Sequence, residues 1–147
     1  RYMELNPSKP AMMLVIDLDN FKHINDTFGH AYGDAVLRLM GECIRSNFRE
    51  NDYKGRFGGD EFVVFLPGVD DKQQVVTYVN NLVEMMKTRV ITPESANPVH
   101  GSIGIALYPK HASTYEELFK KADEALYASK ERGKDRYTFY IPKGVLK

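Results

Sequence analysis

Two short acidic stretches of the sequence could bind one metal ion together. Asp17 ends the apolar run of residues 11–16, and Asp60 and Glu61 follow two glycines in a separate segment. A carboxylate at the end of a buried strand is costly unless a cation or hydrogen-bond donors compensate its charge. If the two segments are neighbours, Asp17 and Asp60 can share a cation, with the Leu18 carbonyl and Glu61 as further ligands. Acids at a turn are more often solvated surface charges, so only the two stretches together favour a metal site.

The oxygen-only donor set predicts magnesium or manganese at such a site. Zinc would need several cysteines or histidines at ligand spacing. The chain has one cysteine, Cys43, and its four histidines are scattered over positions 23, 30, 100 and 111. Magnesium held by a few carboxylates usually takes its remaining ligands from phosphates, so a phosphate-bearing substrate is expected beside it.

The segment after Asp19 carries groups that suit a triphosphate. Its turn supplies backbone N–H groups and Lys22, while Lys130 and Lys134 add positive charge near the end of the last expected helix. Each lysine alone is more often a solvated surface residue. The combination of acids, turn and lysines favours phosphate binding.

Asn25 and Asp34 could recognise a guanine base. An amide and a carboxylate can pair with the N1–H, 2-amino, O6 and N7 groups of guanine. Asp34 is also placed where an aspartate often caps the start of a helix, so both interpretations stay open for it.

The elements that must position these residues alternate between strand and helix patterns. Apolar residues recur at helical spacing from Leu37 to Phe48, and Gly58-Gly59 separates two strand-like segments as a hairpin turn would. The expected order is a strand at 11–16, a short helix and turn at 21–33, a helix from 34 to about 48, a hairpin at 52–66, a helix at 71–89, a loop at 92–98, a strand at 99–109, a helix opened by a capping box at 113–116 and ended by Gly133, and a strand at 136–141. This order predicts an α/β (α+β) fold, with helices on a mixed sheet.

The composition fits one globular domain spanning residues 1–147. Hydrophobic residues make up 43% of the chain and the formal net charge is zero, which does not suit nucleic-acid or membrane-surface binding. The sequence has no apolar run of about 18 residues and no opening signal-peptide pattern, so a cytoplasmic domain is expected. The abrupt start at Arg1 predicts an N-terminally truncated fragment of a longer protein, which could be membrane-anchored elsewhere.

Four motifs, in this order, closely resemble the GGDEF family of diguanylate cyclases. They are DLDNFKHINDTFGHAYGD, RFGGDEF, SIGIA and ADEALYASKERGKDR. The family's bacterial enzymes make cyclic di-GMP from two GTP molecules and release two pyrophosphates. The resemblance implies a central, mainly antiparallel sheet flanked by helices, similar to class III nucleotide cyclases and polymerase palm domains with their ferredoxin-like core. It also implies a transient or regulated homodimer and an upstream sensor or regulatory domain.

The resemblance assigns roles to individual residues. Asp17, Asp60 and the Leu18 carbonyl match metal ligands, and Glu61 matches a further ligand or part of the machinery that deprotonates the attacking 3′-hydroxyl. Asp34 matches the GTP-specific form of the family, since members that also accept ATP carry a smaller residue there. The substrate-binding positions implied are Phe21, Lys22, Asn25, His30, Asp34, Gly58, Gly59, Lys130 and Lys134, with Lys22 also a catalytic residue.

Arg49 and Asp52 fit the family's RxxD motif, at which cyclic di-GMP binds and inhibits the enzyme. Without the resemblance, this spacing is more often an ordinary charge pair at a helix end. Two departures from the family pattern are present. The segment Leu-Thr-Gly-Leu-x-Asn-Arg before the first strand is absent, and GKDR replaces the usual GRNR, so that Lys134 keeps the charge but loses bidentate phosphate contact.

Three functions remain to be separated. The intact signature favours the enzyme, a magnesium-dependent diguanylate cyclase. A catalytically silent GGDEF domain that serves as a receptor for GTP or cyclic di-GMP is the alternative. A purely structural partner domain does not explain why Asp17, Lys22 and Asp60 occur together.

Overall fold

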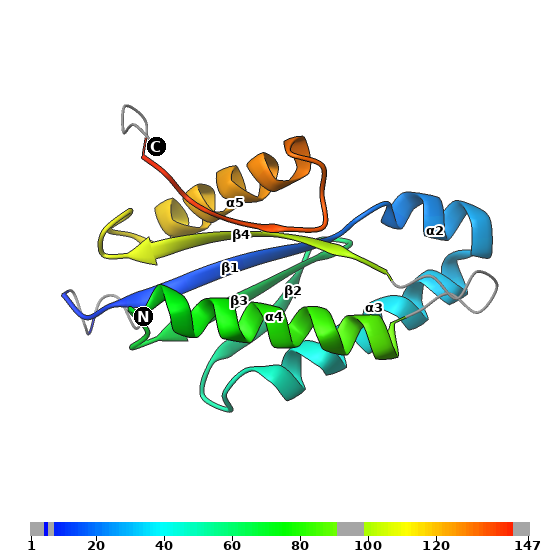
Figure 1. Cartoon of the computed structure of the whole chain (residues 1–147), viewed down its shortest axis with the longest axis horizontal. Coiled ribbons are helices and arrows are strands. Elements are labelled where there is room, and N and C mark those ends of the chain that lie inside the picture. Colours follow the sequence, from blue (N-terminus) through cyan, green and yellow to red (C-terminus); the bar gives the residue numbers. More distant parts are fainter. Residues whose placement is uncertain (1–4, 6–7, 91–98, 143–147) are drawn as a thin grey trace.

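A computed structural model of the chain describes residue 5, residues 8–90 and residues 99–142. Its strands and helices alternate much as the sequence predicts (Figure 1). The elements are β1 (Ala11–Leu18), α2 (Phe21–Phe28), α3 (His30–Asn47), β2 (Tyr53–Phe57), β3 (Glu61–Pro67), α4 (Lys72–Arg89), β4 (Gly101–Tyr108), α5 (Tyr115–Glu131) and β5 (Tyr137–Phe139). The loop expected at 92–98 lies outside the described residues.

The five strands form one sheet in the order β2-β3-β1-β4-β5. The pairings among β2, β3, β1 and β4 are antiparallel, and only β4 and β5 run parallel. The predicted mixed, mainly antiparallel sheet is therefore confirmed. Strand β1 lies in the middle, and six of its eight residues form a run that is buried without interruption from Ala11 to Ile16. This explains why its sequence is continuously apolar instead of alternating.

Helices cover both faces of the sheet. Side chains at even positions of β1, such as Leu14 and Ile16, join the core under α3 and α4, whereas Met13 and Val15 join the core under α5. Figure 1 shows α5 on one side of the sheet and α3 and α4 on the other. Because strand side chains alternate between faces, this register points Asp17 toward the α5 side.

Glycine allows α5 to approach the sheet closely. A Cβ atom added at Gly104 of β4 would overlap with the carbonyl oxygen of Ala122 and the backbone nitrogen of Leu126, both in α5. Gly104 thus makes room for a helix backbone. This close packing fixes the distance of α5 from the sheet, and therefore the position of Lys130 near the C-terminal end of the helix.

Two helix starts differ from the sequence prediction. Helix α3 begins at His30 instead of Asp34, because Gly29 adopts a φ of 92° and separates it from α2. Asp34 therefore lies inside the helix, and capping does not explain it. Helix α5 begins one residue later than predicted, since Thr114 is its N-cap and accepts a hydrogen bond from the Glu117 backbone N–H at 3.1 Å. Within the described residues, no helix combines the length and the apolar character needed to cross a membrane.

Candidate functional site

The two acidic stretches meet at one edge of the fold. Asp17 of β1 pairs directly with Glu61 of β3 across the sheet, and the Leu18 N–H faces the Asp60 carbonyl oxygen at 3.5 Å. The Asp60 carboxyl group is close enough to Asp17 to raise the pKa of the Asp17 side chain. The neighbourhood that a shared metal ion would require is present, although the two residues are 43 positions apart in the sequence.

Asp17 is held in an environment that disfavours its negative charge. Burial is the main reason that the pKa of its carboxyl group is raised to about 7; Lys130 opposes this shift, and the neighbouring Asp60 contributes to it. Its Oδ1 atom is buried and has no hydrogen-bond partner. An unsatisfied buried oxygen of this kind is costly, so a cation or donor supplied by a ligand would be stabilising here.

Lys130 of α5 reaches back to the end of β1. Its Nζ atom lies 3.3 Å from Asp17 Oδ2 and 2.9 Å from Asp19 Oδ1. Burial lowers the pKa of Lys130, but the hydrogen bond to Asp19 and the charges of Asp17 and Asp19 outweigh it, so the net shift is upward. The ammonium group is therefore charged, and its shorter contact is to Asp19.

Asp19 organises this region, a role that the sequence reasoning did not assign to it. The carboxylate is almost fully buried and accepts hydrogen bonds from Ser102 Oγ at 2.6 Å, from Lys130 Nζ and, at 2.9 Å, from the Asp135 backbone N–H. It thus joins the ends of β1, β4 and α5 to the loop before β5. The Asp-x-Asp spacing contained the signal, because residues two apart in a strand share a face.

The other two candidate lysines lie nearer the surface. Lys134 donates a hydrogen bond to Asn20 Oδ1 at 2.9 Å, which links the loop after α5 to the turn before α2. Lys22 forms an ion pair with Asp26 at 3.1 Å, and its side chain is 90% exposed. The structure thus brings Lys130 directly to the carboxylates, places Lys134 at the rim, and leaves Lys22 in solvent.

The candidate guanine-binding residues lie on α2 and α3. Asn25 Oδ1 is the second buried side-chain oxygen without a partner among the described residues. A Cβ atom added at Gly33 would overlap with this oxygen and lie 3.2 Å from the Phe21 ring, so the glycine makes room for both side chains. Asp34 and His30, both on α3, are exposed. Asn25 therefore presents an unsatisfied acceptor next to the helix that carries Asp34.

The turn between β2 and β3 exposes its two glycines. Gly58 has a φ of 72°, a conformation that side chains rarely adopt, and a Cβ atom at Gly58 or Gly59 would meet nothing within 4 Å. The turn can therefore be approached closely by a ligand. Glu61 follows it and is partly buried; burial raises its pKa, and the charges of Asp123 and Asp60 raise it further.

The donor set at this edge fits a magnesium ion better than a metal whose ligands all come from protein side chains. Over residues 8–90 and 99–142, no three Asp, Glu, His or Cys side chains gather closely enough to hold a metal by themselves. Magnesium commonly binds one or two carboxylates and completes its shell with water and phosphates. Asp17, Asp60 and the Leu18 carbonyl, with the unpartnered Asp17 oxygen, match that pattern.

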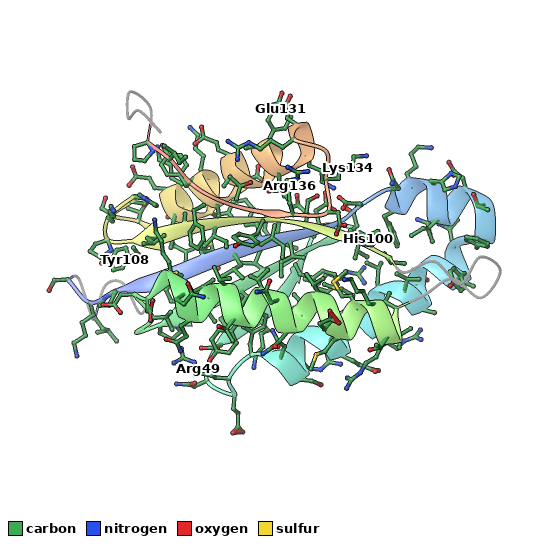
Figure 2. All side chains as sticks on the ribbon, in the orientation of Figure 1. Arg49, His100, Tyr108, Glu131, Lys134 and Arg136 are labelled. Atoms are coloured by element: carbon green, nitrogen blue, oxygen red, sulfur yellow. The ribbon has the colours of Figure 1, made fainter. Side chains whose placement is uncertain are left out.

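Arg49 and Asp52 form a tight pair in the turn after α3. Arg49 Nε and Nη2 contact Asp52 Oδ1 at 2.9 and 2.6 Å, and the Arg49 backbone N–H donates to Asp52 Oδ2 at 2.8 Å. The Asp52 side chain is fully buried, whereas that of Arg49 is 36% exposed. Figure 2 shows Arg49 well apart from Lys134 and His100, so this pair is separate from the acidic site.

Comparisons with known proteins agree on one family. The family model described as "Diguanylate cyclase, GGDEF domain" matches residues 2–136. The diguanylate cyclase DosC of Escherichia coli K12 is 40% identical over 129 residues, which are 86% of this chain and 28% of that protein. The chain thus spans about a quarter of the length of this curated relative.

Solved structures show the same fold. The GGDEF domain of TpbB (YfiN) from Pseudomonas aeruginosa has a TM-score of 0.87 at 33% identity, over 97% of this chain and 89% of that one. The GGDEF domain of DgcB from Caulobacter crescentus, solved in complex with c-di-GMP, has a TM-score of 0.83 at 27% identity, over 95% and 84% of the two chains.

Proposed function

This chain belongs to the GGDEF family of diguanylate cyclase domains, and on that premise we propose that it condenses two GTP molecules into cyclic di-GMP and two pyrophosphates. The observation that carries the proposal is the proximity of Asp60 to Asp17, next to a buried Asp17 oxygen that has no partner. Residues 1–147 act as one such domain within a longer protein, regulated by a domain that precedes it and working in the cytoplasm.

The acidic edge binds the phosphates of GTP together with magnesium or manganese. Asp17, Asp60 and the Leu18 carbonyl would hold the ion, and the ion would supply positive charge to neutralise the phosphate groups. Lys130 contributes a fixed positive charge on the α5 side, because Asp19 keeps its ammonium group in place. Lys134 and Lys22, which lie nearer to solvent, bind the outer phosphates, and the turn at Phe21 adds backbone N–H groups.

The base of GTP is recognised between α2 and α3. Asn25 Oδ1 accepts a hydrogen bond from the guanine edge, which satisfies an oxygen that is otherwise unpaired. Asp34 accepts from the N1–H and 2-amino groups of guanine, which adenine cannot offer in the same pattern. His30 and the turn of Gly58 and Gly59 complete the nucleotide site.

Two copies of the domain must meet for the reaction to proceed. Each copy binds one GTP, and the 3′-hydroxyl of each nucleotide attacks the α-phosphate of the other, in line with the departing pyrophosphate. In this proposal, Asp60 and Glu61 help to remove the hydroxyl proton. The raised pKa of Glu61 suits that role, because a base with a pKa nearer to neutrality takes a proton more readily.

Product inhibition is proposed for the Arg49–Asp52 turn. The DgcB structure is described as a complex with c-di-GMP, and a partly exposed arginine can bind a guanine edge or a phosphate of such a product. Asp52 fixes the guanidinium by direct contact and so presents it already oriented.

A receptor domain without catalysis is the second candidate. It would bind GTP or cyclic di-GMP through the same residues and pass the signal to another part of the protein. The proximity of Asp17 and Asp60 favours the enzyme, because a divalent ion held by both would stabilise charge at the α-phosphate during its transfer.

The test uses the domain fused to a dimer-forming coiled coil and incubated with GTP and magnesium. Chromatography should detect cyclic di-GMP and two equivalents of pyrophosphate, and Asp60→Ala should make none while keeping the fold. The control is Asp70→Ala, which removes an exposed acid away from this edge. A dimer that binds GTP and yields no product would establish the receptor instead.

A further inference from the structure

A basic pocket lies between α3 and the β2–β3 hairpin, on the opposite face of the sheet from the Asp17 side chain. Its volume is about 270 Å³. Four cationic side chains line it: Arg38 and Arg45 from α3, and Lys54 and Arg56 from β2. None of the four takes part in the cyclase mechanism proposed above.

The fold places these four side chains opposite one another. Arg38 and Arg45 are seven residues apart in α3, so they lie on the same side of the helix with Gly41 between them. Lys54 and Arg56 alternate in β2 and share the sheet face that α3 and α4 cover. The two pairs therefore face each other across one pocket.

The positive charge in the pocket is not balanced by the protein. Among the described residues, no carboxylate forms an ion pair with Arg38, Arg45 or Arg56. Lys54 donates a hydrogen bond to the Arg49 carbonyl oxygen at 2.6 Å, which leaves its charge in place. Like charges gathered in this way repel one another, so an anion in the pocket would stabilise the domain.

The floor of the pocket is apolar and leaves space for a ligand. Leu37, Ile44 and Phe62 line it. A Cβ atom at Gly41 would lie 3.6 Å from Arg45 Nη1 and 3.9 Å from Phe62 Cε1, so the glycine keeps the space between these residues open. A larger side chain at position 41 would project into the pocket without a clash at its first atom.

The spacing of the arginines indicates the size of the anion. Seven residues of helix correspond to about 10 Å at a rise of ~1.5 Å per residue, a separation that exceeds the reach of one phosphate group. Guanidinium groups bind phosphate oxygens in a bidentate manner, and three of them surround this pocket. We propose that the pocket between α3 and β2 is a second anion site that binds a diphosphate group, either free pyrophosphate or the diphosphate of a nucleotide.

The pocket also adjoins the candidate inhibitory turn. Lys54, one of its four cations, holds the Arg49 carbonyl oxygen. A diphosphate that draws Lys54 toward the pocket would therefore release the backbone of the Arg49–Asp52 turn from this hydrogen bond. The binding proposal itself needs neither the cyclase activity nor the inhibitory role of that turn.

The experiment titrates pyrophosphate into the domain by calorimetry in the presence of EDTA, so that no metal assists binding at the acidic edge. The double variant Arg38→Gln/Arg45→Gln should weaken binding at least tenfold. The matched control, Lys120→Gln/Arg132→Gln, removes the same charge from exposed positions at α5 and should change affinity by less than twofold. Both pairs are on the surface, and circular dichroism verifies their folding.

A second variant separates the pocket from general charge. Gly41→Leu fills the space and keeps all four cations, and it should also abolish binding. Orthophosphate should bind more weakly than pyrophosphate. GTP binding that depends on Arg38 and Arg45 would also support the site. If GTP binds more tightly than pyrophosphate, the ligand is a nucleotide. If GTP binds no more tightly than pyrophosphate, the ligand is free diphosphate. Absence of pyrophosphate binding, equal losses in the two double variants, or full binding by Gly41→Leu would overturn the proposal.

Discussion

Replacing Asp19 with asparagine removes one charge from the most connected side chain of the candidate site. The carboxylate accepts from Ser102 Oγ at 2.6 Å, Lys130 Nζ at 2.9 Å and the Asp135 N–H at 2.9 Å. An asparagine of the same shape has one acceptor oxygen and one donor nitrogen. In one orientation its NH₂ group faces the Asp135 N–H, and in the other it faces the Lys130 ammonium, so at least one donor is left without an acceptor.

The cost follows from the burial of these groups. A buried donor left unpaired costs about 1–3 kcal/mol, and hydrogen bonds to charged groups are worth about 1.5–3 kcal/mol. Lys130 keeps its contact with Asp17 at 3.3 Å, which limits the loss of its charge partner. We therefore expect Asp19→Asn to lower the free energy of unfolding by about 2–4 kcal/mol.

The assay is urea unfolding at pH 7, followed by circular dichroism. The control is Asp26→Asn, which makes the same chemical change in an exposed ion pair with Lys22 and should cost at most about 0.5 kcal/mol. Equal effects of Asp19→Asn and Asp26→Asn would refute the inference that Asp19 holds the site together. In the proposed cyclase reaction, Asp19→Asn should also raise the magnesium concentration needed for half-maximal rate, because Lys130 then turns toward Asp17.

Three further outcomes are expected. Gly104→Ala should destabilise the domain by about 3 kcal/mol in urea unfolding, because the added methyl group overlaps the backbone of α5. The control Gly41→Ala, in an open part of α3, should be neutral or stabilising. Similar changes in the free energy of unfolding for both variants would contradict the close packing of α5 on β4. His111, whose pKa is lowered to about 4 by burial and by Lys110, Lys72 and Lys121, should make the domain lose stability as the pH falls from about 6.5 toward 4, because the unfolded chain takes up the proton first. The variant His111→Asn should reduce that pH dependence of the free energy of unfolding, measured at several pH values. An unchanged slope of stability against pH would contradict the role of His111. Gly33→Ala should weaken GTP binding by displacing Asn25, whereas unaltered affinity in a calorimetric titration would remove Asn25 from the guanine site.

The order of the elements could be read from the sequence because each carries a local signal. The unbroken apolar run before Asp17 predicts a strand buried on both faces, and β1 is one. The two-glycine turn predicts the β2–β3 hairpin, which the register confirms. The start of α3 was predicted wrongly: aspartate is a frequent cap residue, but the positive φ of Gly29 ends α2 and lets α3 begin at His30.

The sequence could predict that Asp17 and Asp60 share a cation only if their two segments are neighbours. It could not show that they are neighbours, because strand order depends on long-range packing. The structure makes them neighbours by placing β3 next to β1. The hydrogen bonds that Asp19 accepts come from residues more than 80 positions away in the sequence, and no local sequence pattern predicts these hydrogen bonds. The exposure of Lys22 and its pairing with Asp26 were likewise invisible in a sequence that shows only their spacing.

The basic pocket shows the same limit. Its cations come from two segments, and neither Arg38 with Arg45 nor Lys54 with Arg56 is unusual for a surface helix or an edge strand. Only the packing of α3 against β2 brings the two pairs together and reveals that no described carboxylate balances them.

The central claim is that Asp17 and Asp60 share a divalent ion with the phosphates of GTP. Electron paramagnetic resonance of Mn²⁺, titrated into the domain with a GTP analogue that cannot react at the α-phosphate, measures this directly. We expect nucleotide-dependent Mn²⁺ binding that Asp17→Asn and Asp60→Asn each abolish and that Arg49→Ala leaves intact. Mn²⁺ binding that persists unchanged in the Asp60→Asn variant would contradict the claim.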